Sequence, residues 1–310
     1  MIYQLEPNRV RRTYLGGGRI NAFTGFSPAD DGALRPEDWM ASTVSAFNGA
    51  EEIEGEGLGR VADGRLVKDI IGSMPILVKL LDSDERLVIQ AHPTVSFAKA
   101  RMNSAVGKTE CWYFLPGTAP DACVYLGFKP GITREKWVEA FKEQKGMLGM
   151  LHRIPVKAGD FVFVDGGMPH AIGAGCFMVE LQEPSDLMVV AERFTPSGRE
   201  IPEKKITCGL DRSAMFDVYD YRTVAQDEIE RRYVRRGASG CIVGSDLTDK
   251  FSMWRVRGDV LEPSRSRGVA VVLDGEGGIN GIAVRKGDRL VFADEPELSF
   301  TGSAEVVVCS

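Results

Sequence analysis

Short apolar runs, broken at frequent intervals by glycine and proline, restrict the fold of this 310-residue chain more than any other feature. The runs are rich in β-branched and aromatic residues, and 35 glycines and 15 prolines supply the breaks. Short strands at this spacing are typical of an all-β sandwich, barrel or jelly roll. The clearest runs are residues 75–81, 86–92, 110–116, 123–128, 160–166 and 176–182.

Helical patterns are few. The clearest covers residues 134–148, where apolar side chains including Trp137 and Phe141 recur on one face. Thr133 precedes this segment and is a suitable N-cap. A weaker pattern covers residues 95–103. We therefore expect an all-β fold with minor helices, one of them an insertion near residues 134–148.

The order of the runs predicts two β-modules, residues 1–225 and residues 226–310. The charged, glycine-ended segment 226–240 marks the boundary between them. A short repeat supports the division, because residues 156–164 resemble residues 284–292 around a Gly-Asp pair. In this register Leu298 takes the place of His170, so the second module would lack that metal ligand. The alternative is that such a turn is simply common before strands.

Four polar residues in three of the strand-like segments form a candidate metal site. Two of the chain's three histidines, His92 and His170, belong to it, together with Gln90 and Glu110. Alternate residues of a strand share a face, so Gln90 and His92 should point the same way, as should Lys108 and Glu110. Nitrogen and oxygen ligands of this kind suit one Zn²⁺ with an open position, although Mn²⁺, Fe²⁺ or Co²⁺ could occupy the same shell. The alternative is two ordinary polar histidines near turns.

Charge and cysteine content exclude several classes of protein. The net charge of −6 and the pI near 5.3 give no electrostatic support for a nucleic-acid partner. No apolar run approaches the length of a membrane span, and the N-terminus lacks the apolar core of a signal peptide. The six cysteines form no CxxC pair and are expected to be reduced and mostly buried. We therefore expect a cytoplasmic protein with no nucleic-acid or membrane partner, and the choice between a monomer and a homodimer stays open.

The segments LVIQAHP, GKTECWYF, VKAGDFVFVDGGMPHAIGAG and VELQEPSD occur here in the order in which similar segments occur in one known family. Together with PILVKLLD and YLGFKPGITREKW, they resemble the type I mannose-6-phosphate isomerase (phosphomannose isomerase) family of metal-dependent cupins, in its short bacterial form. The similarity runs from about residue 35 to about residue 222. It implies a cupin, or jelly-roll, catalytic barrel followed by a smaller cupin-like β-domain.

The resemblance also implies roles for individual residues. Gln90, His92, Glu110 and His170 match the family's zinc ligands. Lys108 matches a lysine implicated in substrate handling or proton transfer, and Asp186 matches an acidic residue of the active-site wall.

One position departs from the family pattern. Family members place an arginine four residues after the aspartate, where this chain has Val190. Arg193 follows three residues later, and a small shift of the loop would let it serve in catalysis. Arg199, further along, is a candidate for binding the substrate phosphate.

The expected activity is metal-dependent interconversion of mannose 6-phosphate and fructose 6-phosphate through an enediol or enediolate. Lys108 and Asp186 are the candidates for the general base, because Glu110 would be occupied by the metal. Two alternatives remain open. One is a non-catalytic cupin that binds a sugar or sugar phosphate as a sensor or regulator, and the other is an isomerase of a different sugar.

Overall fold

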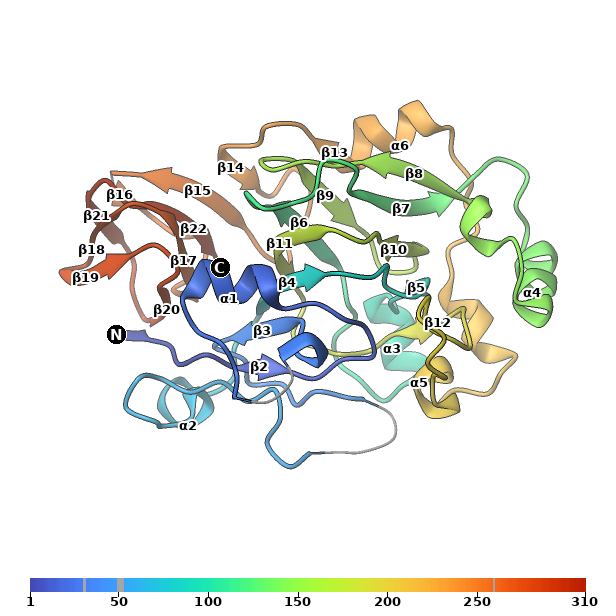
Figure 1. Cartoon of the computed structure of the whole chain (residues 1–310), viewed down its shortest axis with the longest axis horizontal. Helices are drawn as coiled ribbons and strands as arrows, with labels where there is room; N and C mark the ends of the chain where they lie inside the picture. The colour runs from blue at the N-terminus through green and yellow to red at the C-terminus, as the bar shows by residue number, and fades with distance from the viewer. Residues whose placement is uncertain (30–31, 49–52, 259) are drawn as a thin grey trace.

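The computed structural model describes residues 1–29, 32–48, 53–258 and 260–310, and antiparallel sheets dominate it (Figure 1). The largest sheet has the order β13 (Val234–Arg235), β9 (Phe161–Val164), β6 (Glu110–Phe114), β11 (Cys176–Gln182), β4 (Leu77–Ser83), β3 (Glu37–Met40) and β2 (Arg9–Val10). A five-stranded sheet has the order β12 (Val189–Val190), β5 (Gln90–Ala91), β10 (His170–Ile172), β7 (Cys123–Phe128) and β8 (Leu151–Pro155).

The C-terminal part contributes most strands of two more sheets, and these strands gather at one end of the molecule in orange and red in Figure 1. A six-stranded sheet has the order β1 (Ile2–Gln4), β20 (Arg289–Ala293), β17 (Arg267–Asp274), β22 (Glu305–Cys309), β15 (Met253–Arg257) and β14 (Gly240–Val243). A four-stranded sheet has the order β16 (Val260–Leu261), β21 (Leu298–Gly302), β18 (Glu276–Ile279) and β19 (Ile282–Arg285). The all-β architecture expected from the short apolar runs is confirmed.

The seven-stranded sheet is covered on both faces, as the alternation of side chains along β6 shows. Trp112 and Phe114 belong to a core that also contains residues of β7 and β10. Cys111 and Tyr113 belong to a different core, which contains residues of β17 and β22. Because alternate residues of a strand point to opposite faces, β6 packs on the five-stranded sheet with one face and on the six-stranded sheet with the other.

The predicted boundary at residues 225 and 226 does not coincide with a boundary between sheets. β1, from the N-terminus, pairs with β20, while β13 pairs with β9. A single hydrophobic core also joins the seven-stranded and six-stranded sheets. The division into two domains stays a prediction.

Six α-helices, several of them a single turn or two, lie around the sheets in the described residues: α1 (Gly18–Thr24), α2 (Val67–Ile71), α3 (Val95–Arg101), α4 (Arg134–Glu143), α5 (Glu203–Thr207) and α6 (Gln226–Tyr233). Thr133 caps α4 as predicted, because its side chain accepts a hydrogen bond from the backbone N–H of Lys136. The expectation of a helix to residue 148 is wrong. α4 ends at Glu143 because Gln144 adopts the left-handed conformation, with φ of 52°, and a 3-10 turn, Met147–Met150, follows.

The short repeat in the sequence corresponds to the same turn in both places. Gly159 and Gly287 have φ of 87° and 88°, a conformation that favours glycine. The following aspartates each accept a hydrogen bond from the backbone N–H three residues earlier, at 3.2 Å for Asp160 and 2.9 Å for Asp288. Leu298 then begins β21 as His170 begins β10, and its side chain is fully buried among apolar residues.

All six cysteines are free, and four of them are buried. Among the described residues, no helix has both the length and the apolar character needed to cross a lipid bilayer.

Candidate metal centre

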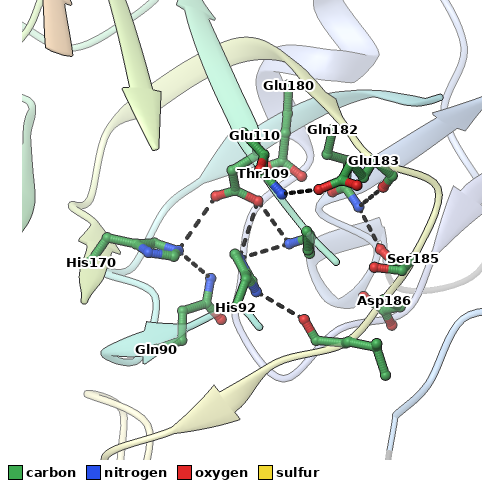
Figure 2. A network of polar contacts seen from close by, with 12 residues as sticks. Gln90, His92, Thr109, Glu110, His170, Glu180, Gln182, Glu183, Ser185 and Asp186 are labelled. Carbon is green, nitrogen blue, oxygen red and sulfur yellow. Dashed lines mark hydrogen bonds and ion pairs between the residues drawn. The ribbon is translucent and has the colours of Figure 1, made fainter. Parts of the chain in front are cut away.

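Three strands from two sheets bring the predicted metal ligands together (Figure 2). β5 and β10 are neighbours in the five-stranded sheet, and Gln90 lies directly opposite His170 in their register. Glu110 begins β6 in the facing seven-stranded sheet, and His92 follows the end of β5. All four side chains are buried. The predicted convergence is therefore what the structure contains, and the ligand atoms of His92, Glu110 and His170 lie within 4.8 Å of one another.

The carboxylate of Glu110 lies between the two imidazoles. Its Oε2 atom is 3.1 Å from Nε2 of His92, and its Oε1 atom is 3.4 Å from Nε2 of His170. The side-chain amide nitrogen of Gln90 lies 3.3 Å from Nε2 of His170. Because the two ends of an amide have nearly the same shape, a rotation of this group would place its oxygen toward the same centre.

Backbone carbonyls fix both imidazoles. Nδ1 of His92 lies 2.9 Å from the carbonyl of Leu187, and Nδ1 of His170 lies 2.8 Å from that of Met168. A carbonyl can only accept, so each Nδ1 carries the proton and each Nε2 presents a lone pair to the centre. Burial lowers the pKa of His170, and burial together with Lys108 lowers the pKa of His92 to about 3. Both rings are neutral at neutral pH, which is the form that binds metal.

The centre attracts positive charge. Burial alone would raise the pKa of Glu110, but Lys108 and His92 hold it well below its usual range. Both carboxylate oxygens are buried, and their polar neighbours are Lys108 and the two imidazoles. The ammonium group of Lys108 lies 2.8 Å from both Nε2 of His92 and Oε2 of Glu110. The centre therefore has a donor set that fits a divalent cation: the Nε2 lone pairs of the two histidines, the ionised carboxylate of Glu110 and the adjacent amide of Gln90.

A cavity of about 30 Å³ adjoins this centre. Gln90 and Lys108 belong to its wall, which connects it to the cluster, and the other walls carry charged and apolar side chains. They are Arg12, Thr13, Tyr14, Glu37, Lys79, Leu81, Leu87, Val88, Glu180, Met188, Val190, Ile201 and Lys205. This volume is large enough to hold a water molecule.

One side of the cavity is a buried network around Glu37. Tyr14 and Trp39 each donate a hydrogen bond of 2.6 Å to this carboxylate. Lys79 lies 3.6 Å from Glu37 and 2.7 Å from Glu180. Burial alone would lower the pKa of Lys79, but the two carboxylates raise it above its usual range. Burial, in turn, raises the pKa of Glu180.

Asp186 lies behind the cavity wall, where it binds Arg12. Its two oxygens accept hydrogen bonds of 2.9 Å from the two terminal nitrogens of that arginine, and one also accepts from the backbone N–H of Phe47. Burial alone would raise the pKa of Asp186, but Arg12 and Lys205 hold it well below its usual range. Lys205 donates to the carbonyl of Phe47. Burial, followed by the charge of Arg12, lowers its pKa to about 7.

Arg193 and Arg199, predicted to act in catalysis and phosphate binding, do not line the cavity. The guanidinium of Arg193 lies 5.3 Å from the ring centre of Phe141, on α4. Arg199 forms an ion pair with Glu85. Val190, by contrast, does line the cavity, and it lies opposite Gln90 in the pairing of β12 with β5. The structure thus brings Lys108 to the predicted metal cluster, places Asp186 beside Arg12, and places Arg193 and Arg199 elsewhere.

Several charged residues that line the cavity were not predicted from the sequence. Lys79 and Glu180 each interrupt an apolar run, and they lie opposite each other in the pairing of β4 with β11. A charge inside an apolar strand was a usable signal, because such groups are rarely buried without a partner. Arg12 and Lys205 carried no comparable signal.

Similar proteins found by sequence and by structure are described as mannose-6-phosphate isomerases. No family model matches the chain. A protein of Bacillus subtilis described as a "probable mannose-6-phosphate isomerase" is 32% identical over 216 residues, which are 67% of this chain and 65% of that protein. The chain thus aligns with just under two thirds of this relative's length.

Solved structures share the fold over the whole chain. A mannose 6-phosphate isomerase from Bacillus subtilis superposes with a TM-score of 0.76 at 20% identity, covering 100% of this chain and 99% of the other. A mannose 6-phosphate isomerase described as bound with zinc and yttrium gives a TM-score of 0.67 at 13% identity, covering 99% and 98%.

Proposed function

We propose that the chain is a type I mannose-6-phosphate isomerase, which interconverts mannose 6-phosphate and fructose 6-phosphate with the help of one divalent cation. The observation that carries this proposal is the buried cluster of His92, Glu110 and His170 beside a cavity rich in cations. The names of the relatives support the substrate.

Gln90, His92, Glu110 and His170 would hold the cation. Zn²⁺ is our first choice because a neighbour in fold is described as bound with zinc and because nitrogen and oxygen ligands suit it. Mn²⁺, Fe²⁺ and Co²⁺ are the alternatives. When bound, the ion would polarise the sugar carbonyl and so ease loss of a proton from the neighbouring carbon.

The residues of the chain supply the proton transfer. Isomerisation moves a proton between two adjacent carbons, so one group must take it from carbon and return it. Glu180 lines the cavity, and its raised pKa makes it a stronger base than an ordinary carboxylate. Lys108 stabilises the negative charge that develops on the substrate oxygen. Asp186, bound on both oxygens by Arg12, contributes through that arginine rather than as the base.

Positive charge around the cavity favours a phosphorylated sugar. Arg12, Lys79, Lys108 and Lys205 line it, against only two carboxylates, Glu37 and Glu180. The excess is confined to the lining, because Glu110 and Asp186 pair with Lys108 and Arg12 from just outside it. The cavity of about 30 Å³ is far below the roughly 300 Å³ at which ligand pockets begin, so side chains must rearrange when the substrate binds. Arg193 and Arg199 could take part only through such a rearrangement, and their roles stay predictions.

A direct assay tests the proposal. Protein stripped with a chelator and reloaded with one equivalent of Zn²⁺ is incubated with mannose 6-phosphate, and fructose 6-phosphate is followed with coupling enzymes. We expect turnover by the wild type, loss of turnover in His92→Ala, and near wild-type turnover in His152→Ala. His152 is the matched control, because it is the histidine outside the cluster and its Nε2 lies 2.9 Å from the carbonyl of Val224.

The alternatives predict different results in the same assay. No turnover of any hexose phosphate, together with tight binding of one, would replace the proposal with a sugar-phosphate sensor. Turnover confined to an unphosphorylated sugar would replace it with an isomerase of another substrate.

A further inference from the structure

Among the described residues that line the cavity, Arg12 is the only arginine. It follows β2, and the pairing of β2 with β3 places it beside Glu37. The charge therefore reaches the cavity from the N-terminal segment, far in sequence from the metal cluster. Only 5% of the Arg12 side chain is exposed.

Two carboxylates orient the Arg12 guanidinium. Its terminal nitrogens donate to the two oxygens of Asp186 at 2.9 Å, and its Nε lies 3.1 Å from Glu37. The ring of Trp39 lies 5.6 Å from the guanidinium carbon. Each terminal nitrogen carries a second N–H that these contacts do not use. A guanidinium held in this way is oriented before a ligand arrives, so little conformational entropy is lost on binding.

The strand beside the candidate metal centre offers no cation to the same cavity. Val190 lies opposite Gln90 and contributes an apolar surface. Three residues later, Arg193 lies over the ring of Phe141 instead of lining the cavity. A positively charged group that recognises an anionic substrate on this side has to come from another part of the chain.

We propose that Arg12 contacts the substrate through its remaining N–H groups, and that Asp186 and Glu37 are positioning residues which act through it. The inference rests on the proposed function, because the ligand is taken to be a hexose phosphate. Arg12 supplies from the N-terminal segment the cation that position 190 lacks. It stabilises negative charge on the substrate, both when the substrate binds and while the proton moves.

The test compares a conservative variant of Arg12 with the same exchange at an exposed arginine. In Arg12→Lys the charge remains but the paired N–H groups are lost, and we expect kcat/KM to fall about 100-fold. Binding of mannitol 6-phosphate, which has no carbonyl and cannot be isomerised, should weaken about tenfold in calorimetry. Zinc content and melting temperature report whether the fold and the metal centre survive. Arg285→Lys, the same exchange at an exposed position on β19, should match the wild type in every measurement.

A second pair of variants tests whether an arginine at position 190 can replace the one at position 12. Arg12→Leu combined with Val190→Arg should have a kcat/KM about tenfold above that of Arg12→Leu alone, because the register points position 190 toward the same cavity. Wild-type kcat/KM and affinity in Arg12→Lys would overturn the inference. So would a loss of activity fully explained by lost zinc or lost folded protein.

Failure of the proposed function gives a distinct result. If the wild type isomerises no hexose phosphate, that function is refuted, and binding of mannitol 6-phosphate then decides the inference alone. Binding by the wild type that weakens about tenfold in Arg12→Lys supports a substrate-contacting arginine. Equal binding by both proteins, or none by the wild type, refutes it.

Discussion

Acid is expected to destabilise the metal-free protein through Glu37, a carboxylate that the fold keeps ionised. The side chain is buried and accepts hydrogen bonds of 2.6 Å from both Tyr14 and Trp39. Burial alone would raise its pKa, but Arg12 and Lys79 lower it to about 2. Protonation of Glu37 in the folded state would weaken the contacts that hold these two cations beside the cavity.

The size of the effect follows from the two pKa values. The pKa of Glu37 is about 2 in the folded protein and 4.5 for the unperturbed group. Because the folded value is the lower one, the unfolded chain takes up the proton first as the pH falls. The contribution of Glu37 is therefore complete above about pH 5 and is lost toward pH 2. The difference corresponds to about 3 kcal/mol, of which about 2 kcal/mol is lost by pH 3.

Urea unfolding, followed by tryptophan fluorescence at several pH values between 7 and 3, measures this loss. The protein is kept free of metal so that acid release of the ion does not contribute. Glu37→Gln should be less stable at pH 7 but should lose about 2 kcal/mol less than the wild type by pH 3. Glu54→Gln, at an exposed position, should follow the wild-type curve. Equal pH dependence in the wild type and in Glu37→Gln would refute this reasoning.

Three further substitutions probe the site and the core. Lys108→Met should lower kcat about 100-fold while zinc content stays at the wild-type level, measured by steady-state kinetics and metal analysis. Gly107→Ala should also lower kcat, because the added Cβ would lie 2.7 Å from the carbonyl oxygen of Pro93 and displace the adjacent Lys108; wild-type kinetics would contradict this. Leu181→Ala, in the core that joins two sheets, should cost about 2–5 kcal/mol in a single unfolding transition, whereas two separate transitions would show that the sheets unfold independently.

Much of the metal cluster could be predicted from the sequence because strand geometry is local. The two-residue period placed Gln90 with His92, and Lys108 with Glu110, and the structure brings both pairs to one centre. The same period accounts for β6, where Trp112 and Cys111 belong to different cores.

The remainder of the cavity depends on pairings between distant strands, which no local pattern specifies. Lys79 meets Glu180 because β4 pairs with β11, and Arg12 reaches Asp186 across 174 residues of sequence. The end of α4 was also missed, because helix propensity does not specify the left-handed backbone of Gln144, whose side chain hydrogen-bonds the distant residues Ala191 and Arg193.

The central claim is that Gln90, His92, Glu110 and His170 share one cation beside the cavity. Anomalous diffraction from crystals of the protein grown with stoichiometric zinc, recorded on both sides of the zinc absorption edge, tests it most directly. We predict one strong peak per chain, within bonding distance of Nε2 of both histidines and of the Glu110 carboxylate. Full-occupancy zinc at another place in the chain, with no peak at this centre, would contradict the account.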